Sequence, residues 1–412
     1  MSVDSNQASQ PVYFNCHMCG ECCSSWNIPI ETEKAQRLLA KPWVQARLAE
    51  TNRQLTPMTP ETYRIPLTDE NVCVFLAEDR RCLVEAHEGL SLKPHECQRF
   101  PFAKVRLPDG SEWHETSAAC KSISEKLLLA FQPIQPKPVK QFATYSNDEA
   151  DKAPEWKLLD GALDAMQAEE EYLDPIARLP KRIPVRHFQS LSMEQYHSYQ
   201  RQLRQIFMTP ALRPEAALFQ AHRFLSLLGR GQENRWSEHS VTKTRRLNPG
   251  LAGLLRLYFL RKPYRTWSWI SLLLGRTYAD PRIFGMPVAL REQAKLAWND
   301  DLNLHLNAFL FNLLQRKRMI ALGSSLSAHL AMAGIACLLV QWYAKTLAWL
   351  RNSPEISEND LASAIRLVER YYTGHQPRFL AFFTARWIPE MLSGLMFGWS
   401  VCRSALNIKK IT

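Results

Sequence analysis

The chain has 412 residues, of which 46% are hydrophobic, so it is long enough to bury two or three substantial cores. A protein of this size does not need disulfides to stay folded, which excludes the class of small disulfide-bonded scaffolds. The formal net charge is +11, but residues 1–130 hold 14 Lys and Arg against 17 Asp and Glu, so the positive excess lies further along. Its basic residues are scattered through apolar helical patterns, which gives no clear nucleic-acid site.

Residues 1–12 are polar and lack the apolar segment of an export signal, and we expect them to be disordered. We therefore expect a cytoplasmic, reducing compartment, where clustered cysteines are metal ligands or redox groups rather than disulfides. The longest apolar stretch, 326–350, is interrupted by His329, Gln341 and Lys345. It predicts a buried helix and not a transmembrane segment.

Cysteine is concentrated in the first third of the chain. Four cysteines within eight positions, Cys16, Cys19, Cys22 and Cys23, have the spacing C-x2-C-x2-C-C, and Gly20 can supply a tight turn among them. Thiolates at two-residue gaps converge on one metal ion in structural zinc sites, and three of them are also typical of bacterial ferredoxins. Zinc and iron–sulfur both accept all-thiolate ligands, so the spacing leaves the metal open.

Adjacent side chains usually point apart, so we expect the first three cysteines of this run to share a centre. Cys23 would then serve a second centre or pack as a small buried residue. Four more cysteines complete a set of eight candidate ligands, enough for one or two centres: Cys73, Cys82, Cys97 and Cys120. Cys337 and Cys402 fall in apolar helical segments and are predicted core residues. Four histidines of the region are weaker candidates, since there are thiols enough without them: His17, His87, His95 and His114.

The elements predicted between these cysteines are short. Residues 31–50 have the periodicity of an amphipathic helix with a disturbance at Pro42. Residues 51–66 are rich in Thr and Pro and predict a loop. Ser91 is predicted to cap a helical turn that has Pro94 in its first positions.

Two hairpins are predicted from short β-prone runs on either side of a turn. The first pairs 72–76 with 81–84 about a charged turn and places one cysteine on each arm. The second pairs 102–107 with 111–116 about Pro-Asp-Gly. Each later cysteine thus borders a turn or a small element, which is how small metal-binding folds present their ligands.

The rest of the chain reads as helical. Residues 131–153 predict a Pro-rich linker and 154–412 an α-helical domain, in which Ser357 and Asp360 resemble a capping box. The predicted helices are 154–173, 192–207, 214–228, 251–259, 267–274, 287–320 with a break, 326–350, 357–372 and 379–406. We therefore predict an α+β, mostly α, fold: a small cysteine-rich metal-binding domain of hairpins and turns over 13–130, followed by the α-helical domain.

The cysteine region resembles a known family. Phe14 followed by C-x2-C-x2-C-C, and downstream Cys73-Val-Phe-Leu, Cys82-Leu-Val and Lys93-Pro-His-Glu-Cys-Gln-Arg-Phe-Pro, are similar to the motifs of the bacterial YkgJ-like cysteine-cluster family. Members of that family are described as zinc- or iron-chelating. Lys93 stands where Arg is usual. The resemblance covers roughly residues 13–125 and implies that the cysteines ligate one or two centres.

The same family includes flagellin lysine-N-methylases, which place the cysteine region before a helical domain and use S-adenosylmethionine. The resemblance thus implies either a metal-binding or redox module whose helical domain engages a partner, or a methyltransferase that docks a protein substrate. The sequence has no Rossmann glycine fingerprint, no C-x3-C-x2-C radical motif and no P-loop. We predict metal binding, with an iron–sulfur centre (4Fe–4S) ahead of zinc, and S-adenosylmethionine as a cofactor of the methyltransferase alternative only.

Overall fold

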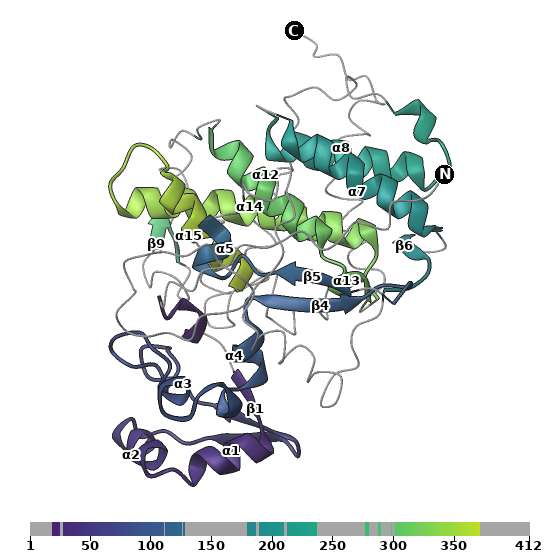
Figure 1. Cartoon of the computed structure of the whole chain (residues 1–412). Coiled ribbons are helices and arrows are strands. Elements are labelled where there is room, and N and C mark those ends of the chain that lie inside the picture. Colours follow the sequence, from purple (N-terminus) through teal and green to yellow (C-terminus); the bar gives the residue numbers. More distant parts are fainter. Residues whose placement is uncertain are drawn as a thin grey trace, which may run out of the picture. The chain divides into compact units, whose positions relative to one another are not determined.

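The computed structural model describes residues 19–24, 28–110, 112–125, 127, 179–186, 189–209, 212–236, 277–279, 287–289, 298, 301–321 and 323–370. These residues divide into two compact units, which are described separately below (Figure 1). The first unit takes the residues up to 106 together with 112–123, and the second takes 107–110, 124–127 and those from 179 on. A small part with strands and turns precedes a helical part, which confirms the predicted fold class. Six predicted segments lie outside the described residues: 1–12, 131–153, 154–173, 251–259, 267–274 and 379–406.

A three-stranded antiparallel sheet opens the first unit. Its strands are β1 (Ile28–Glu31), β2 (Thr56–Thr59) and β3 (Thr62–Ile65), in the spatial order β1-β3-β2. Ile28 pairs with Ile65, and both side chains are buried. The prediction of a loop over 51–66 was wrong. Proline in β2 concealed a strand that tolerates it because the strand lies at the edge of the sheet, and β3 is stabilised by a partner distant in sequence.

The predicted helix over 31–50 forms as two helices, α1 (Thr32–Leu39) and α2 (Pro42–Glu50). Pro42 occupies the first position of α2, where its missing N–H costs nothing, and it cannot continue α1. Each helix turns its apolar residues toward the core beneath the sheet. The buried members are Ala35, Leu38, Val44 and Leu48.

The predicted first hairpin is a tight turn that leads into a helix. The Ala77 N–H donates to the Arg81 carbonyl at 2.9 Å, and Leu76 and Cys82 form a single antiparallel bridge. The second arm was predicted wrongly, because Leu83–Glu88 form α3. Its Glu-Ala-His-Glu sequence contains good helix formers, and one apolar bridge does not hold it extended.

A short 3-10 turn, η2 (Leu90–Leu92), leads into helix α4 (His95–Arg99). Pro94 is the N-cap residue of α4 and not one of its first helical residues. Ser91 was predicted to cap this helix, and that prediction was wrong. Its hydroxyl donates to the Glu88 carbonyl at 3.4 Å. The second predicted hairpin is confirmed as β4 (Phe102–Arg106) paired with β5 (Glu112–Thr116), and α5 (Lys121–Glu125) follows.

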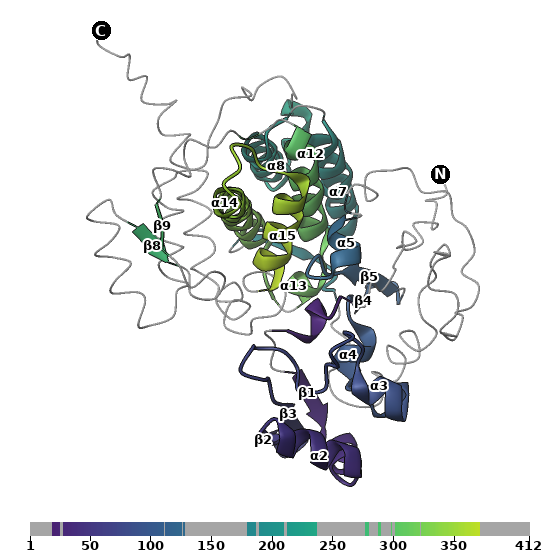
Figure 2. The same cartoon turned by 90° about the vertical axis from the view of Figure 1, so that its left-hand side faces the viewer.

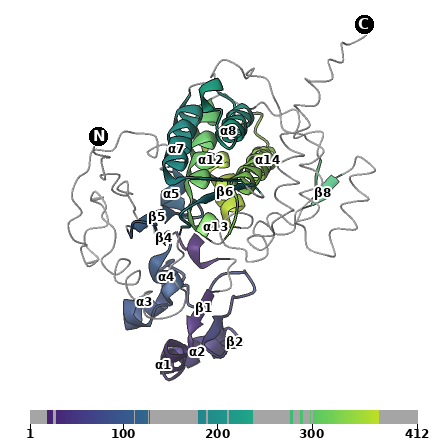
Figure 3. The same ribbon diagram turned by 90° about the vertical axis from the view of Figure 1, so that its right-hand side faces the viewer.

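Helices build the second unit. They are α7 (Met193–Met208), α8 (Pro214–Leu228), α12 (Asp301–Gln315), α13 (Arg318–Ala321), α14 (Leu326–Leu350) and α15 (Glu358–Val368), with a 3-10 turn η4 (Glu233–Arg235). Figures 2 and 3 show α7, α8, α12, α14 and α15 packed side by side, and α14 contacts α8, α12 and α15. Every one of these α-helices falls within a predicted helical segment to within a residue or two at its ends, and the break expected in 287–320 separates α12 from α13.

Two short antiparallel pairs in this unit were not predicted. They are β6 (Ile183–Arg186) with β7 (Gln189–Leu191), and β8 (Thr277–Ala279) with β9 (Pro287–Ala289). β9 replaces the start of the helix predicted over 287–320. The backbone N–H and C=O groups of β9 form hydrogen bonds with β8, whereas in a helix they would bond within the same segment.

Helix α14 is the one described helix that is long and apolar enough to cross a membrane by length and composition. Within its most apolar 18-residue window, 89% is buried inside the protein. The prediction of a buried helix over 326–350 is therefore confirmed. Cys337, at its centre, is fully buried as predicted, while Cys402 lies outside the described residues.

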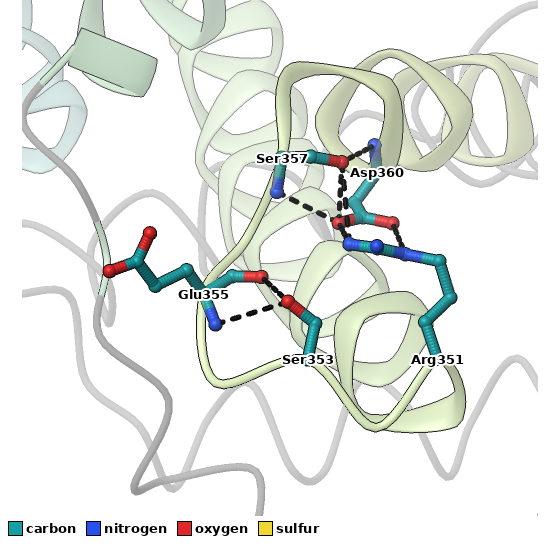
Figure 4. A network of polar contacts seen from close by, with 5 residues as sticks. All are labelled: Arg351, Ser353, Glu355, Ser357 and Asp360. Atoms are coloured by element: carbon teal, nitrogen blue, oxygen red, sulfur yellow. Dashed lines mark hydrogen bonds and ion pairs between the residues drawn. The ribbon is translucent and has the colours of Figure 1, made fainter.

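The turn from α14 into α15 contains the predicted capping box (Figure 4). The Ser357 hydroxyl accepts from the Asp360 N–H at 3.2 Å, and the Asp360 carboxylate accepts from the Ser357 N–H at 2.8 Å. The Arg351 guanidinium, just past the end of α14, forms an ion pair with the same carboxylate. The buried Asp360 carboxylate thus provides an acceptor for a backbone N–H at the start of α15 and holds the arginine at the end of α14.

Candidate metal centre

Seven of the eight predicted ligands lie among the described residues, and Cys16 lies outside them. None of the described cysteines forms a disulfide. Cys73 is buried, Cys22 is exposed and the remaining candidates are half-buried: Cys19, Cys23, Cys82, Cys97 and Cys120. The thiols are therefore available for metal, and the question is which of them the backbone brings together.

Cys22 and Cys23 lie on a 3-10 turn, η1 (Glu21–Cys23). Gly20 precedes the turn with φ +68°, and its carbonyl accepts from the Cys23 N–H at 2.9 Å. The predicted tight turn at Gly20 is thus confirmed. A Cβ at this position would approach the Leu76 side chain to 3.1 Å, so the position favours glycine for space as well as for conformation.

The two adjacent sulfurs do not point apart, as the sequence led us to expect. The Sγ atoms of Cys22 and Cys23 are 3.9 Å apart. In a strand, neighbouring side chains point to opposite faces, whereas on a 3-10 turn they are separated by about 120° around the axis. The turn that follows Gly20 therefore brings both thiols to one side.

The backbone then ties this run to the segment around Cys73. Ser24 forms an antiparallel bridge with Val72, and the Cys73 N–H donates to the Cys23 carbonyl at 2.6 Å. Cys73 is only 6% exposed and belongs to the hydrophobic core of the first unit. Cysteines that are distant in the sequence are thus neighbours through their main chains.

Cys82 and Cys97 belong to two short helices. Cys82 is the N-cap residue of α3, and Cys97 lies in the first turn of α4, where its N–H donates to the Pro94 carbonyl at 2.9 Å. Both side chains pack against the same core cluster as Cys23. Three separate elements therefore present thiols to one apolar region.

Electrostatic coupling indicates that four of these thiols lie in the same region. Burial raises the pKa of the Cys73 thiol to about 12, and charge on Cys82 and Cys22 acts in the same direction. Burial also raises the pKa of Cys97, as does charge on Cys73, Cys82 and Cys22, while Lys93 opposes it. Such effects decay with distance, so these four thiols share one region.

Cys19 is coupled to the segment that follows Cys120. Burial raises the pKa of Cys19, whereas the Glu21 N–H and the charge of Lys121 lower it. Lys121 directly follows Cys120, whose N–H donates to the Ser117 carbonyl at 3.2 Å. The chain at Cys120 therefore passes near Cys19. Cys19 is the first described cysteine of the run.

The prediction that Cys16, Cys19 and Cys22 share one centre can be compared with the structure only for Cys19 and Cys22, because Cys16 is outside the described residues. Cys22 lies within reach of both Cys19 and Cys73, since its charge affects the pKa of each of these thiols. Within the described ranges, no three His, Cys, Asp or Glu side chains stand close enough to hold an ion as they are placed. A bound ion would have to draw the thiols inward.

The predicted histidines are engaged elsewhere or lie outside the description. His87 is exposed and stacks on Trp43 with ring centroids 4.7 Å apart. His95 Nε2 lies 3.9 Å from the Glu31 carboxylate. His17 and the side chain of His114 are not among the described atoms. Neither described histidine stands in a group that could hold a metal ion.

The donor chemistry nevertheless fits zinc or iron. The thiols come from at least three elements, remain reduced, and border an apolar core with cationic side chains nearby. Arg47 donates to the Val74 carbonyl at 2.9 Å beside Cys73 and lowers the pKa of that thiol. Such cations stabilise the negative charge of a tetrathiolate centre, and thiolates are the ligands that zinc and iron–sulfur centres share.

Comparison with known proteins places this region in a class of metal-chelating domains. The family model CxxCxxCC, described as a putative zinc- or iron-chelating domain, matches residues 15–121. All eight predicted ligands fall inside the matched residues. The family resemblance inferred from the motifs is thereby confirmed for residues 15–121, which match the CxxCxxCC family model. The searches of curated proteins and of solved structures found no match.

Proposed function

We propose that the CxxCxxCC domain is a thiolate metal centre for zinc or iron, with ligands drawn from five cysteines. They are Cys22, Cys23, Cys73, Cys82 and Cys97. The observation that carries the proposal is the main-chain bond from Cys73 to Cys23, which joins the two halves of the motif. Zinc would supply a structural cross-link or a Lewis acid there, and an iron–sulfur cluster would supply electron transfer.

The distance between Cys22 and Cys23 bears on the kind of metal. Two thiolates on one tetrahedral zinc, with Zn–S about 2.3 Å, are about 3.8 Å apart. The observed Sγ separation is 3.9 Å. In a cubane cluster each cysteine binds a different iron, so the pair supports one metal ion that takes both thiolates. The iron–sulfur centre favoured from the spacing stays a prediction, and we propose zinc or a single iron for this pair.

Anaerobic purification of the full chain, with metal analysis and an absorption spectrum, tests the proposal. Colourless protein with stoichiometric zinc supports a zinc centre, and coloured protein with iron and sulfide supports a cluster. Cys73→Ser should abolish metal content, whereas Cys337→Ser, fully buried in α14, should leave it unchanged. Wild-type protein that holds neither metal when purified anaerobically and refuses both on reconstitution would refute the proposal.

A second candidate is methyl transfer from S-adenosylmethionine to a lysine of a protein substrate that docks on the helical unit. Its support is the layout, since a cysteine-rich domain precedes a mainly helical unit, as in flagellin lysine-N-methylases. The described strands pair only antiparallel, so a Rossmann-type site is not part of the described residues. Calorimetry of the metal-loaded protein with S-adenosylmethionine tests it, and absence of binding would remove it. The cytoplasmic compartment likewise remains part of this proposal.

A further inference from the structure

An ion pair joins the two helices that carry Cys82 and Cys97. The Lys93 Nζ lies 2.5 Å from the Glu85 carboxylate. Glu85 is in the first turn of α3, whose N-cap is Cys82, and Lys93 immediately precedes Pro94, the N-cap of α4, which carries Cys97. No other ion pair between described side chains links these two helical segments. The pair therefore spans the gap between two candidate ligands.

The main chain of Lys93 is held firmly at this point. Its N–H donates to the Leu90 carbonyl at 3.0 Å. Its own carbonyl accepts from the Gln98 side chain at 2.6 Å and from the Lys34 ammonium at 3.1 Å. The Lys93 side chain is 18% exposed. These bonds fix the backbone of Lys93 next to α4, so its side chain starts from a defined position.

Lys93 also places a positive charge beside the thiols. Burial lowers the pKa of its ammonium, but negative charge on Glu85, Cys82 and Cys97 raises it by more, so it stays protonated. Lys34, which contacts the Lys93 carbonyl, is itself paired with Glu31 at 3.5 Å. Charge on Cys97 acts to raise the pKa of the Lys34 ammonium. The charges of both lysines therefore favour the thiolate form of Cys97, and that of Lys93 favours the thiolate form of Cys82 as well.

We propose that the Lys93–Glu85 ion pair is a positioning clasp that holds Cys82 and Cys97 at the spacing one metal centre requires. This inference rests on the proposed metal-binding function; it adds Glu85, which is not a residue of the motif, and gives a role to Lys93, which is. Groups that orient ligands without touching the metal change metal affinity by about 10–100-fold when they are removed. The clasp is distinct from a charge effect, because a clasp needs its carboxylate as much as its ammonium.

The test is the Zn²⁺ affinity of the full chain, measured by competition with a chromophoric chelator. Lys93→Met and Glu85→Ala should each weaken binding about 10–100-fold, and Lys93→Arg should restore it to within a few-fold of wild type. Lys41→Met is the matched control. It removes the 2.7 Å Lys41–Glu88 ion pair at the other end of α3, where hydrogen bonds from Lys41 and Trp43 lower the pKa of Glu88.

The two variants separate the clasp from simple electrostatics. Loss of Glu85 leaves the Lys93 charge beside the thiols, so a pure charge effect predicts unchanged or tighter binding in Glu85→Ala. That result, or unchanged affinity in Lys93→Met, would overturn the inference. Circular dichroism of the metal-free variants checks that each is folded, and if Lys93→Met fails to fold, Glu85→Ala decides alone. Wild-type protein without Zn²⁺ affinity would instead count against the metal-binding proposal itself.

Discussion

Asp360 gives a prediction whose size follows from the structure. The residue is 4% exposed, and its carboxylate accepts hydrogen bonds from the Ser357 N–H and hydroxyl, both at 2.8 Å, and from Arg351 Nε at 2.9 Å. Asp360→Ala removes half of a capping box, which costs about 0.5–2 kcal/mol. Arg351 is half exposed and becomes hydrated when its partner is lost, so the ion pair adds little. We expect a loss of about 1–2 kcal/mol in the free energy of unfolding.

The pH dependence of that loss is fixed in sign. Burial acts to raise the pKa of Asp360, but hydrogen bonds from Arg351 and Ser357 outweigh it and place the pKa below its ordinary value. A carboxylate with a depressed folded-state pKa stabilises the protein fully above its unfolded pKa, about 3.9. The stabilisation disappears as the pH falls from there through the folded-state pKa. The gap between wild type and Asp360→Ala should therefore be full at pH 7 and should shrink below about pH 4.

Urea denaturation of the full chain, followed by far-ultraviolet circular dichroism, measures the difference. A shift of about 1 kcal/mol corresponds to roughly 2–4 °C in melting temperature for a unit of this size. Glu355→Gln is the control, because Glu355 bonds to Ser353 only through its main chain and its side chain is exposed (Figure 4). Equal stability of Asp360→Ala and wild type at pH 7, or a gap that persists undiminished at pH 3, would refute the reasoning.

Three further predictions concern the cores and the metal. Glu369→Ala should destabilise the protein by about 3–5 kcal/mol, because it leaves Arg316, whose guanidinium donates to that buried carboxylate at 2.6 Å, without its charge partner; a urea midpoint equal to that of Glu355→Gln would contradict this. Leu38→Ala should cost about 2–5 kcal/mol, since Leu38 is fully buried in the core of the first unit, and the same denaturation assay measures it. Removing metal with a chelator should speed proteolysis between Gly20 and Cys97; an unchanged cleavage pattern would argue against a metal that orders this segment.

The helices of the second unit were predictable because their signals are local. Ser357 and Asp360 are three residues apart, and the apolar spacing of α7, α8, α14 and α15 lies within each helix. The three-stranded sheet was not predictable in the same way. β3 pairs with β1, although α1 and α2 separate the two strands in the sequence, and the stability of β3 comes from that distant partner. The proline in β2 favours a loop when only the sequence is considered, because proline is compatible with a strand mainly at the edge of a sheet.

The candidate site shows the same division. Spacing alone predicted the eight cysteines as candidate ligands, because thiolate chemistry and two-residue gaps suffice for that prediction. Spacing could not say which cysteines meet, and the expected separation of Cys22 from Cys23 was wrong. The proximity of these cysteines depends on the 3-10 turn after Gly20 and on the hydrogen bond from the Cys73 N–H to the Cys23 carbonyl. Neither feature produces a periodic pattern in the sequence. Grouping of ligands is thus a property of tertiary contacts.

The core of the first unit also bears on what the metal does. Metal binding and folding are linked in small metal sites that have little core of their own. The structure gives this unit an apolar core in which the sheet, α1 and α2 bury Ile30, Leu38 and Val44, and Cys73 is the one cysteine among the buried members of that core. Only the segments around Cys73, Cys82 and Cys97 border the thiols. We therefore expect metal to order these segments, while the sheet, α1 and α2 are held mainly by their own apolar side chains.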